Sequence, residues 1–85
     1  MSGEESTTEP DDEAVVRTAV EAAEGVIFAA YRRAAIRDVD VTVHFADAQL
    51  AVDVYLDVPD DPAVDQVADE AAMAARRAVD DLLGE

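Results

Sequence analysis

The sequence contains no cysteine, no lysine and no tryptophan, and its one histidine is His44. The absence of cysteine excludes disulfide bonds and thiolate metal sites, and a single histidine offers too few ligands for a structural zinc centre. No stretch of about 18 apolar residues exists, so we expect no membrane span. The first residues are acidic and polar, unlike a signal peptide, and we therefore expect a cytoplasmic protein.

Sequence patterns that accompany catalysis are also missing. There is no phosphate-binding GxxxxGK[ST] loop, no HExxH metal motif and no GxSxG nucleophile motif. No Ser or Cys nucleophile accompanies His44. We therefore expect a protein that is not an enzyme and has no cofactor.

The charge balance is strongly one-sided. The chain has 21 acidic residues and 6 basic ones, all arginine, which gives a formal net charge of −15. Such a charge disfavours compaction at low ionic strength. In multimolar salt the Debye length is about 3 Å or less, and repulsion between surface carboxylates is largely screened. Because 51% of the residues are apolar, we expect a folded protein from a high-salt cytoplasm. An ordinary acidic protein is the alternative.

The chain has 85 residues, enough for one domain. Residues 1–10, MSGEESTTEP, are predicted to be a disordered acidic tail, and residues 11–85 a single domain. A chain of this size buries roughly 60% of its unfolded surface, and small domains usually need an additional stabilising device. With disulfides and zinc excluded, oligomerisation is the device that remains.

Residues 11 to about 36 have helical periodicity. The predicted apolar stripe consists of Val16, Val20, Ala23, Ile27, Ala30 and Ala34. Gly25 falls inside this helix at a cost of about 1 kcal/mol relative to alanine, and we expect it to allow the close approach of another backbone. Arg32, Arg33 and Arg37 would then occupy the last turn, where positive charge suits the helix dipole.

Residues 38–58 alternate strictly between apolar and polar side chains, which predicts two half-buried strands in an antiparallel hairpin. Pairing Phe45 with Leu50 also pairs Val43 with Val52, Val41 with Val54 and Val39 with Leu56. This register places every apolar side chain on one face. A two-residue turn at Asp47 and Ala48 and a four-residue loop over 46–49 fit the register equally well.

A second helix follows the segment Pro59-Asp60-Asp61-Pro62, with Asp61 predicted as N-cap and Pro62 as the first helical residue. Gly84 provides a C-terminal stop. The predicted apolar stripe consists of Val64, Val67, Ala68, Ala71, Ala75, Ala78, Val79 and Leu82.

The predicted fold is α+β in the order α-β-β-α, with both helices packed on one face of the hairpin. A two-stranded sheet is marginal in water and leaves two edges with unpaired backbone groups. We therefore expect a homodimer in which two hairpins form a four-stranded sheet with twofold symmetry. A monomer whose edges are protected by aspartates is the alternative.

The outer face of the hairpin carries the candidate site residues Asp40, Thr42, His44, Asp53 and Tyr55. We interpret them as a solvated acidic face that can also border a partner or dimer edge. The alternative is a divalent metal site or a proton-transfer site around His44.

Five of the six cations lie in two groups, Arg32, Arg33 and Arg37 in one and Arg76 and Arg77 in the other. Dipole compensation and salt bridges are one interpretation. The alternative is an RNA or phosphate contact through Arg32, Arg33 and Arg37, because guanidinium groups bind phosphate bidentately. The global charge opposes nucleic-acid binding.

The chain resembles the small archaeal domain-of-unknown-function family 3194 in its haloarchaeal form. The similarity lies in Tyr31-Arg32-Arg33, the DVDVTV strand at 38–43, the LAVDVYLDV strand at 50–58 and the VADEAAMAARRAVDDL helix at 67–82. The resemblance implies no activity and no site residues. The genes of that family often neighbour prefoldin beta-subunit genes, which implies a role near protein folding or translation. We therefore expect a non-catalytic, homodimeric binding module with a protein partner in that machinery.

Overall fold

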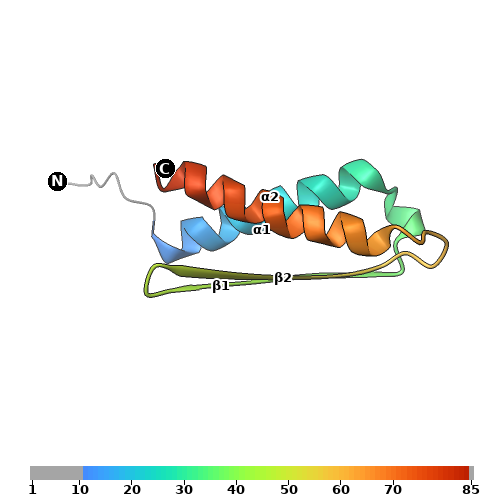
Figure 1. Ribbon diagram of the computed structural model, residues 1–85, viewed down its shortest axis with the longest axis horizontal. Helices are drawn as coiled ribbons and strands as arrows, with labels where there is room; N and C mark the ends of the chain where they lie inside the picture. Colours follow the sequence, from blue (N-terminus) through green and yellow to red (C-terminus); the bar gives the residue numbers. More distant parts are fainter. Residues whose placement is uncertain (1–10, 85) are drawn as a thin grey trace.

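The computed structural model describes residues 11–84, and the predicted tail at residues 1–10 lies outside this range. The elements are α1 (Asp12–Ala30), the short 3-10 helix η1 (Arg33–Ala35), β1 (Asp38–Ala46), β2 (Gln49–Asp57) and α2 (Val64–Leu82). The two helices lie side by side on one face of the hairpin, with α1 against β1 and α2 against β2 (Figure 1). The predicted α+β fold and its α-β-β-α order are confirmed.

The helices and the hairpin match in length. A 19-residue helix is about 28 Å long and a nine-residue strand about 30 Å, so each helix runs along its whole strand. The predicted first helix, which extended to residue 36, would have been longer than its strand.

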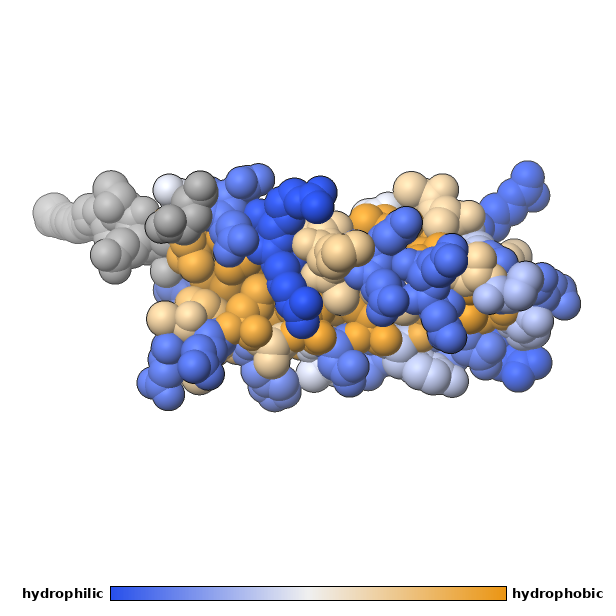
Figure 2. All heavy atoms as spheres, in the orientation of Figure 1, coloured by the Kyte–Doolittle hydropathy of each residue, from blue (hydrophilic) through white to orange (hydrophobic). Residues whose placement is uncertain are grey.

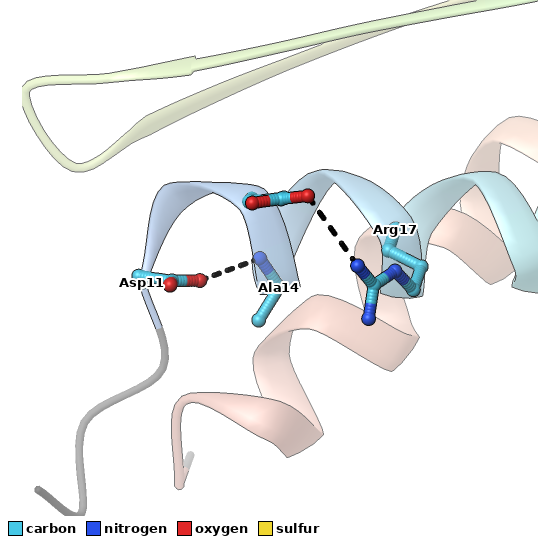
Figure 3. A network of polar contacts seen from close by, with 4 residues as sticks. Asp11, Ala14 and Arg17 are labelled. Carbon is cyan, nitrogen blue, oxygen red and sulfur yellow. Dashed lines mark hydrogen bonds and ion pairs between the residues drawn. The ribbon is translucent and has the colours of Figure 1, made fainter. Parts of the chain in front are cut away.

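α1 begins where the acidic segment predicted a start. The Asp11 side chain accepts a hydrogen bond of 2.8 Å from the Ala14 backbone N–H, and the Arg17 guanidinium lies 3.4 Å from the Glu13 carboxylate (Figure 3). Asp11 is thus the N-cap, and it satisfies one of the free N–H groups of the first turn.

The predicted end of the first helix was wrong. α1 stops at Ala30, and Tyr31 has an extended backbone with φ −136° and ψ 147°. The three arginines therefore do not occupy a last helical turn, and dipole compensation does not explain them. The buried stripe of α1 also differs from the predicted one and consists of Val15, Ala19, Ala23 and Ile27.

The hairpin register is confirmed pair by pair, including Phe45 with Leu50 and Val39 with Leu56. Ala46 pairs with Gln49, which selects the two-residue turn over the four-residue loop. Asp47 and Ala48 both have positive φ values, 54° and 61°. Two positive φ values characterise the tight turns that suit the twist of a hairpin.

The start of α2 differs by two residues from the prediction. α2 begins at Val64 with Ala63 as N-cap, and Ala63 provides no side-chain cap. The Asp61 carboxylate instead accepts a hydrogen bond of 2.8 Å from the Ala63 N–H, and one of 2.5 Å from the Tyr31 hydroxyl. Asp61 thus ties the turn before α2 to the residue that ends α1.

The core is small and lies mainly between the helices. Its buried members are Val15, Ala19, Ala23, Ile27, Leu56, Val58, Ala71, Ala75 and Val79. Only Leu56 and Val58 come from the hairpin segment, whereas the other apolar strand residues are half-buried. The helices therefore leave the apolar face of the hairpin incompletely covered along its length.

The expectation that Gly25 permits a close backbone contact was wrong. Gly25 is exposed, and a Cβ added there would meet no atom within 4 Å. Ala48 presents the opposite case, because it has a side chain at a left-handed position that favours glycine. Gly84, with φ +86°, follows α2 as predicted.

Two opposite exchanges should both stabilise the fold. Gly25→Ala should raise the free energy of unfolding by about 1 kcal/mol, because alanine costs less backbone entropy inside a helix. Ala48→Gly should raise it by less than about 1 kcal/mol, since relief of left-handed strain outweighs the added backbone entropy. Thermal and urea unfolding at one fixed KCl concentration measure both changes.

Gly84→Ala is the matched control, because it makes the same exchange as Gly25→Ala at a positive φ. It should bring no gain in stability. A loss of stability in Gly25→Ala would contradict the open environment of that position.

The Tyr31–Asp61 hydrogen bond changes the acidity of both side chains. The carboxylate acceptor raises the pKa of Tyr31 to about 12. The Tyr31 hydroxyl, followed by the Ala63 N–H, lowers the pKa of Asp61. The bond therefore favours a neutral tyrosine and an ionised aspartate.

Removal of this bond should change stability at both ends of the pH range. The contribution of Asp61 is present above its unfolded pKa of about 4 and is lost as pH falls through its lower folded pKa. The contribution of Tyr31 is present below about pH 10 and is lost as pH rises through about 12. Tyr31→Phe should destabilise the protein at neutral pH. Its melting temperature should also fall less than that of the wild type as the pH is moved toward the acidic and the alkaline extremes. Tyr55→Phe, at a 55% exposed tyrosine, is the control, and equal profiles for the two variants would contradict the contact.

Candidate functional site

The outer face of the hairpin holds the five polar residues that the sequence singled out. Thr42 pairs with Asp53 and Asp40 with Tyr55, as predicted from the register. The Thr42 hydroxyl lies 3.4 Å from an Asp40 carboxylate oxygen, a long and exposed contact. Tyr55 has the most exposed large apolar side chain of the described residues. This face is polar and open to water, and the side chains are not held in a fixed constellation.

The structure does not bring His44 together with carboxylates across the hairpin. Its cross-strand partner is Ala51, near the turn, whereas Asp53 faces Thr42. Among residues 11–84, no three His, Asp or Glu side chains are grouped so that they could hold a metal ion. Proton transfer also requires a second group within hydrogen-bond reach, and none is recorded for His44 in the described part of the chain. His44 is thus an exposed residue at the end of the hairpin.

The arginines after α1 have separate local roles. The Arg33 guanidinium lies 4.8 Å above the centre of the Phe28 ring. Arg37 reaches to 3.6 Å from the Asp57 carboxylate, and its backbone N–H donates to the Asp57 carbonyl at 2.8 Å. Arg32 is exposed and precedes η1. Two of the three predicted anion-binding groups therefore already contact an aromatic ring or a carboxylate.

A shallow hollow lies beside these arginines. Its volume is about 220 Å³, and its lining is Phe28, Arg33, Ile36, Arg37, Asp38 and Val39. Arg32 is not part of the lining, so the hollow brings together two of the three cations. Asp38 adds a negative charge that opposes the binding of an anion.

A larger groove of about 440 Å³ runs between β2 and α2. Its apolar lining consists of Val52 and Val54 from β2 and of Ala68, Ala72 and Met73 from α2. Figure 2 shows apolar surface between the hairpin and α2, crossed by polar side chains. Asp53, Asp69 and Arg76 supply the charged lining.

The groove follows from a difference in width between the two layers. Packed helices lie about 8–10 Å apart, whereas neighbouring strands lie about 4.8 Å apart. Two helices side by side are therefore wider than the two strands beneath them, and each extends beyond the edge of its strand. The groove was not predicted from the sequence, although the α-β-β-α order already implies this difference in width.

None of the helices described by the structure combines the length and the apolar character needed to cross a membrane.

The comparisons with known proteins give one clear result. No known family model matches the chain, and no solved structure does so either. The chain is similar to an uncharacterized protein of the haloarchaeon Natronomonas pharaonis, with 46% identity over 78 residues. The aligned region covers 92% of this chain and 94% of the relative. At this identity and coverage, the chain belongs to the same haloarchaeal family of uncharacterized proteins.

Proposed function

We propose that the protein is a non-catalytic binding module that acts as a homodimer and binds an extended segment of a protein partner along β2. The observation that carries this proposal is the groove beside the free edge of β2. The described residues contain a two-stranded sheet and no assembled catalytic constellation, whereas an unpaired sheet edge is a common place for strand addition.

The hairpin geometry supplies the hydrogen-bonding groups for an added strand. Because Ala46 and Gln49 flank a two-residue turn, they form a hydrogen-bonded pair, and such pairs alternate along an antiparallel ladder. The N–H and C=O groups of Val52 and Val54 therefore point away from β1. Their side chains line the groove, so one edge offers both backbone pairing and apolar contact.

One extended strand fits this place better than a whole second hairpin. With a helix diameter of about 10 Å added to the spacing of helices and strands, α2 extends beyond β2 by about the width of one strand. A second copy paired edge to edge in one sheet would place its own α2 in the same space. A partner segment that brings only a strand avoids this overlap. We therefore assign the β2 edge to a partner and place the contact between copies elsewhere.

The partner is expected among folding or translation proteins. Support comes from the resemblance to family 3194, which stays a prediction because no family model matches. A segment with alternating apolar side chains would place every second side chain in the groove.

An RNA or phosphate contact through Arg32, Arg33 and Arg37 is the second candidate. The observation in its favour is the hollow that contains Arg33 and Arg37. The contacts of Arg33 with Phe28 and of Arg37 with Asp57 weaken it, since an anion would compete with both. A metal-binding or enzymatic role around His44 has no comparable observation in its favour.

A proline on the β2 edge tests the proposal. Val54→Pro removes an outward-pointing N–H and leaves the donors of the β1–β2 ladder in place, so it should abolish partner binding and preserve the hairpin. Tagged protein is recovered from the native host at its own salt concentration, and the bound proteins and RNA are identified. Circular dichroism confirms that the variant remains folded.

Val41→Pro is the matched control, because Val41 is the cross-strand neighbour of Val54 and belongs to the β1 edge. One partner protein should be recovered with the wild type and with Val41→Pro, and lost with Val54→Pro. Equal recovery by a folded Val54→Pro variant would contradict the β2 site. Recovery of RNA that disappears when Arg32, Arg33 and Arg37 are changed to Gln would favour the second candidate instead.

A further inference from the structure

The outward face of α2 has a symmetric arrangement of charge around one apolar residue. The sequence from Asp69 to Arg77 reads Asp-Glu-Ala-Ala-Met-Ala-Ala-Arg-Arg, with Met73 at its centre. The acidic pair lies four and three residues before Met73, and the basic pair three and four residues after it. Residues at these spacings share one face of a helix, so all five side chains lie on the same face.

This face is turned away from the core. Ala71, Ala75 and Val79 are the buried residues of α2, whereas Asp69, Glu70, Arg76 and Arg77 are exposed. Met73 is 51% exposed, although methionine is an apolar side chain. An exposed methionine bordered by charged residues is a common feature of interaction surfaces.

None of the charges on this face belongs to an ion pair of the described residues. The ion pairs recorded among residues 11–84 are those of Arg17 and Arg37, so neither Arg76 nor Arg77 has a described carboxylate partner within 4.0 Å. The helix dipole does not account for them either, because α2 has no basic residue in its last turn. An acidic pair and a basic pair seven residues apart are also too distant along one helix to contact each other.

We propose that this face binds a second copy of the chain through antiparallel packing of two α2 helices on a twofold axis at Met73. Asp69 and Arg76 flank Met73 on the side of the β2–α2 groove, and Glu70 and Arg77 flank it on the other side. Twofold antiparallel packing sets each flank against the same flank of the second copy. Asp69 then faces Arg76 of the second copy, and Glu70 faces its Arg77. Twofold symmetry doubles these contacts to four ion pairs around two methionines. The placement deepens the homodimer part of the proposed function and rests on it.

The shape of the surface fits this arrangement. Met73 borders the β2–α2 groove on one side. On its other side lies a hollow of about 280 Å³ between α1 and α2, lined by Val26, Glu70, Met73, Ala74 and Arg77. The methionine is thus a ridge between two depressions, and the Met73 of a second copy can occupy the hollow.

Charge reversal provides the test. Asp69→Arg with Glu70→Arg leaves four arginines on the face, and Arg76→Glu with Arg77→Glu leaves four acids. For each double variant alone, the dimer dissociation constant should be at least about tenfold higher than for the wild type, because like charges face each other. An equimolar mixture should restore a dimer with one chain of each kind. Light scattering over a concentration range measures this, at the lowest KCl concentration that retains the helical circular dichroism, since salt screens the pairs.

Asp38→Arg with Asp40→Arg is the matched control, because it changes the net charge as much as the Asp69 and Glu70 variant does, but at two exposed positions of β1, in the layer opposite the outward face of α2. Its dimer dissociation constant should equal that of the wild type. Met73→Asp provides an independent variant at an exposed position and should be monomeric and folded. A wild type with the mass of one chain at every concentration would refute the homodimer itself. A dimer that persists in Met73→Asp and in both reversed variants would refute the α2 contact and leave the homodimer standing.

Discussion

The difference in spacing between helices and strands determines most features of this protein. Two packed helices need about 8–10 Å between their axes, and the two strands beneath them are about 4.8 Å apart. The helices therefore form most of their core with each other, as the buried alanines of α1 and α2 indicate. The apolar side chains of the hairpin stay half-buried. The same mismatch creates the groove beside β2.

This constraint separates two kinds of contact. The edge of β2 lies under α2 and has room for about one added strand, which suits a partner segment. The outer face of α2 borders this groove on one side and carries Met73 between opposite charges. The two contacts are adjacent, because one uses the sheet layer and the other the outside of the helix layer, and they share the groove residues Asp69, Met73 and Arg76. In high salt the ion pairs contribute little strength and mainly set the orientation of the helices.

The hairpin register could be predicted completely from the sequence, because strict alternation makes any one-residue shift expose every apolar side chain. The end of α1 could not be predicted. The residues after Ala30 continue a helical pattern, and the contact that fixes the chain there joins Tyr31 to Asp61, 30 positions away. The same contact draws Asp61 away from the predicted capping role at the start of α2.

The candidate sites were predictable only as lists of charged residues. The sequence placed Arg32, Arg33 and Arg37 in one group, but their partners Phe28 and Asp57 come from packing. The pattern of charges around Met73 can be read from the sequence, but only the structure places it on the side of α2 opposite the core. Likewise, the groove depends on the relative widths of two layers, a property that no single motif carries.

Amide hydrogen exchange along β2 of the isolated protein in concentrated KCl tests the width constraint most directly. The account predicts alternation, with slow exchange at Ala51 and Asp53, whose N–H groups bind β1, and fast exchange at Val52 and Val54, whose N–H groups point outward. Equal protection of all four amides would mean that a second hairpin pairs with β2, and it would contradict the account.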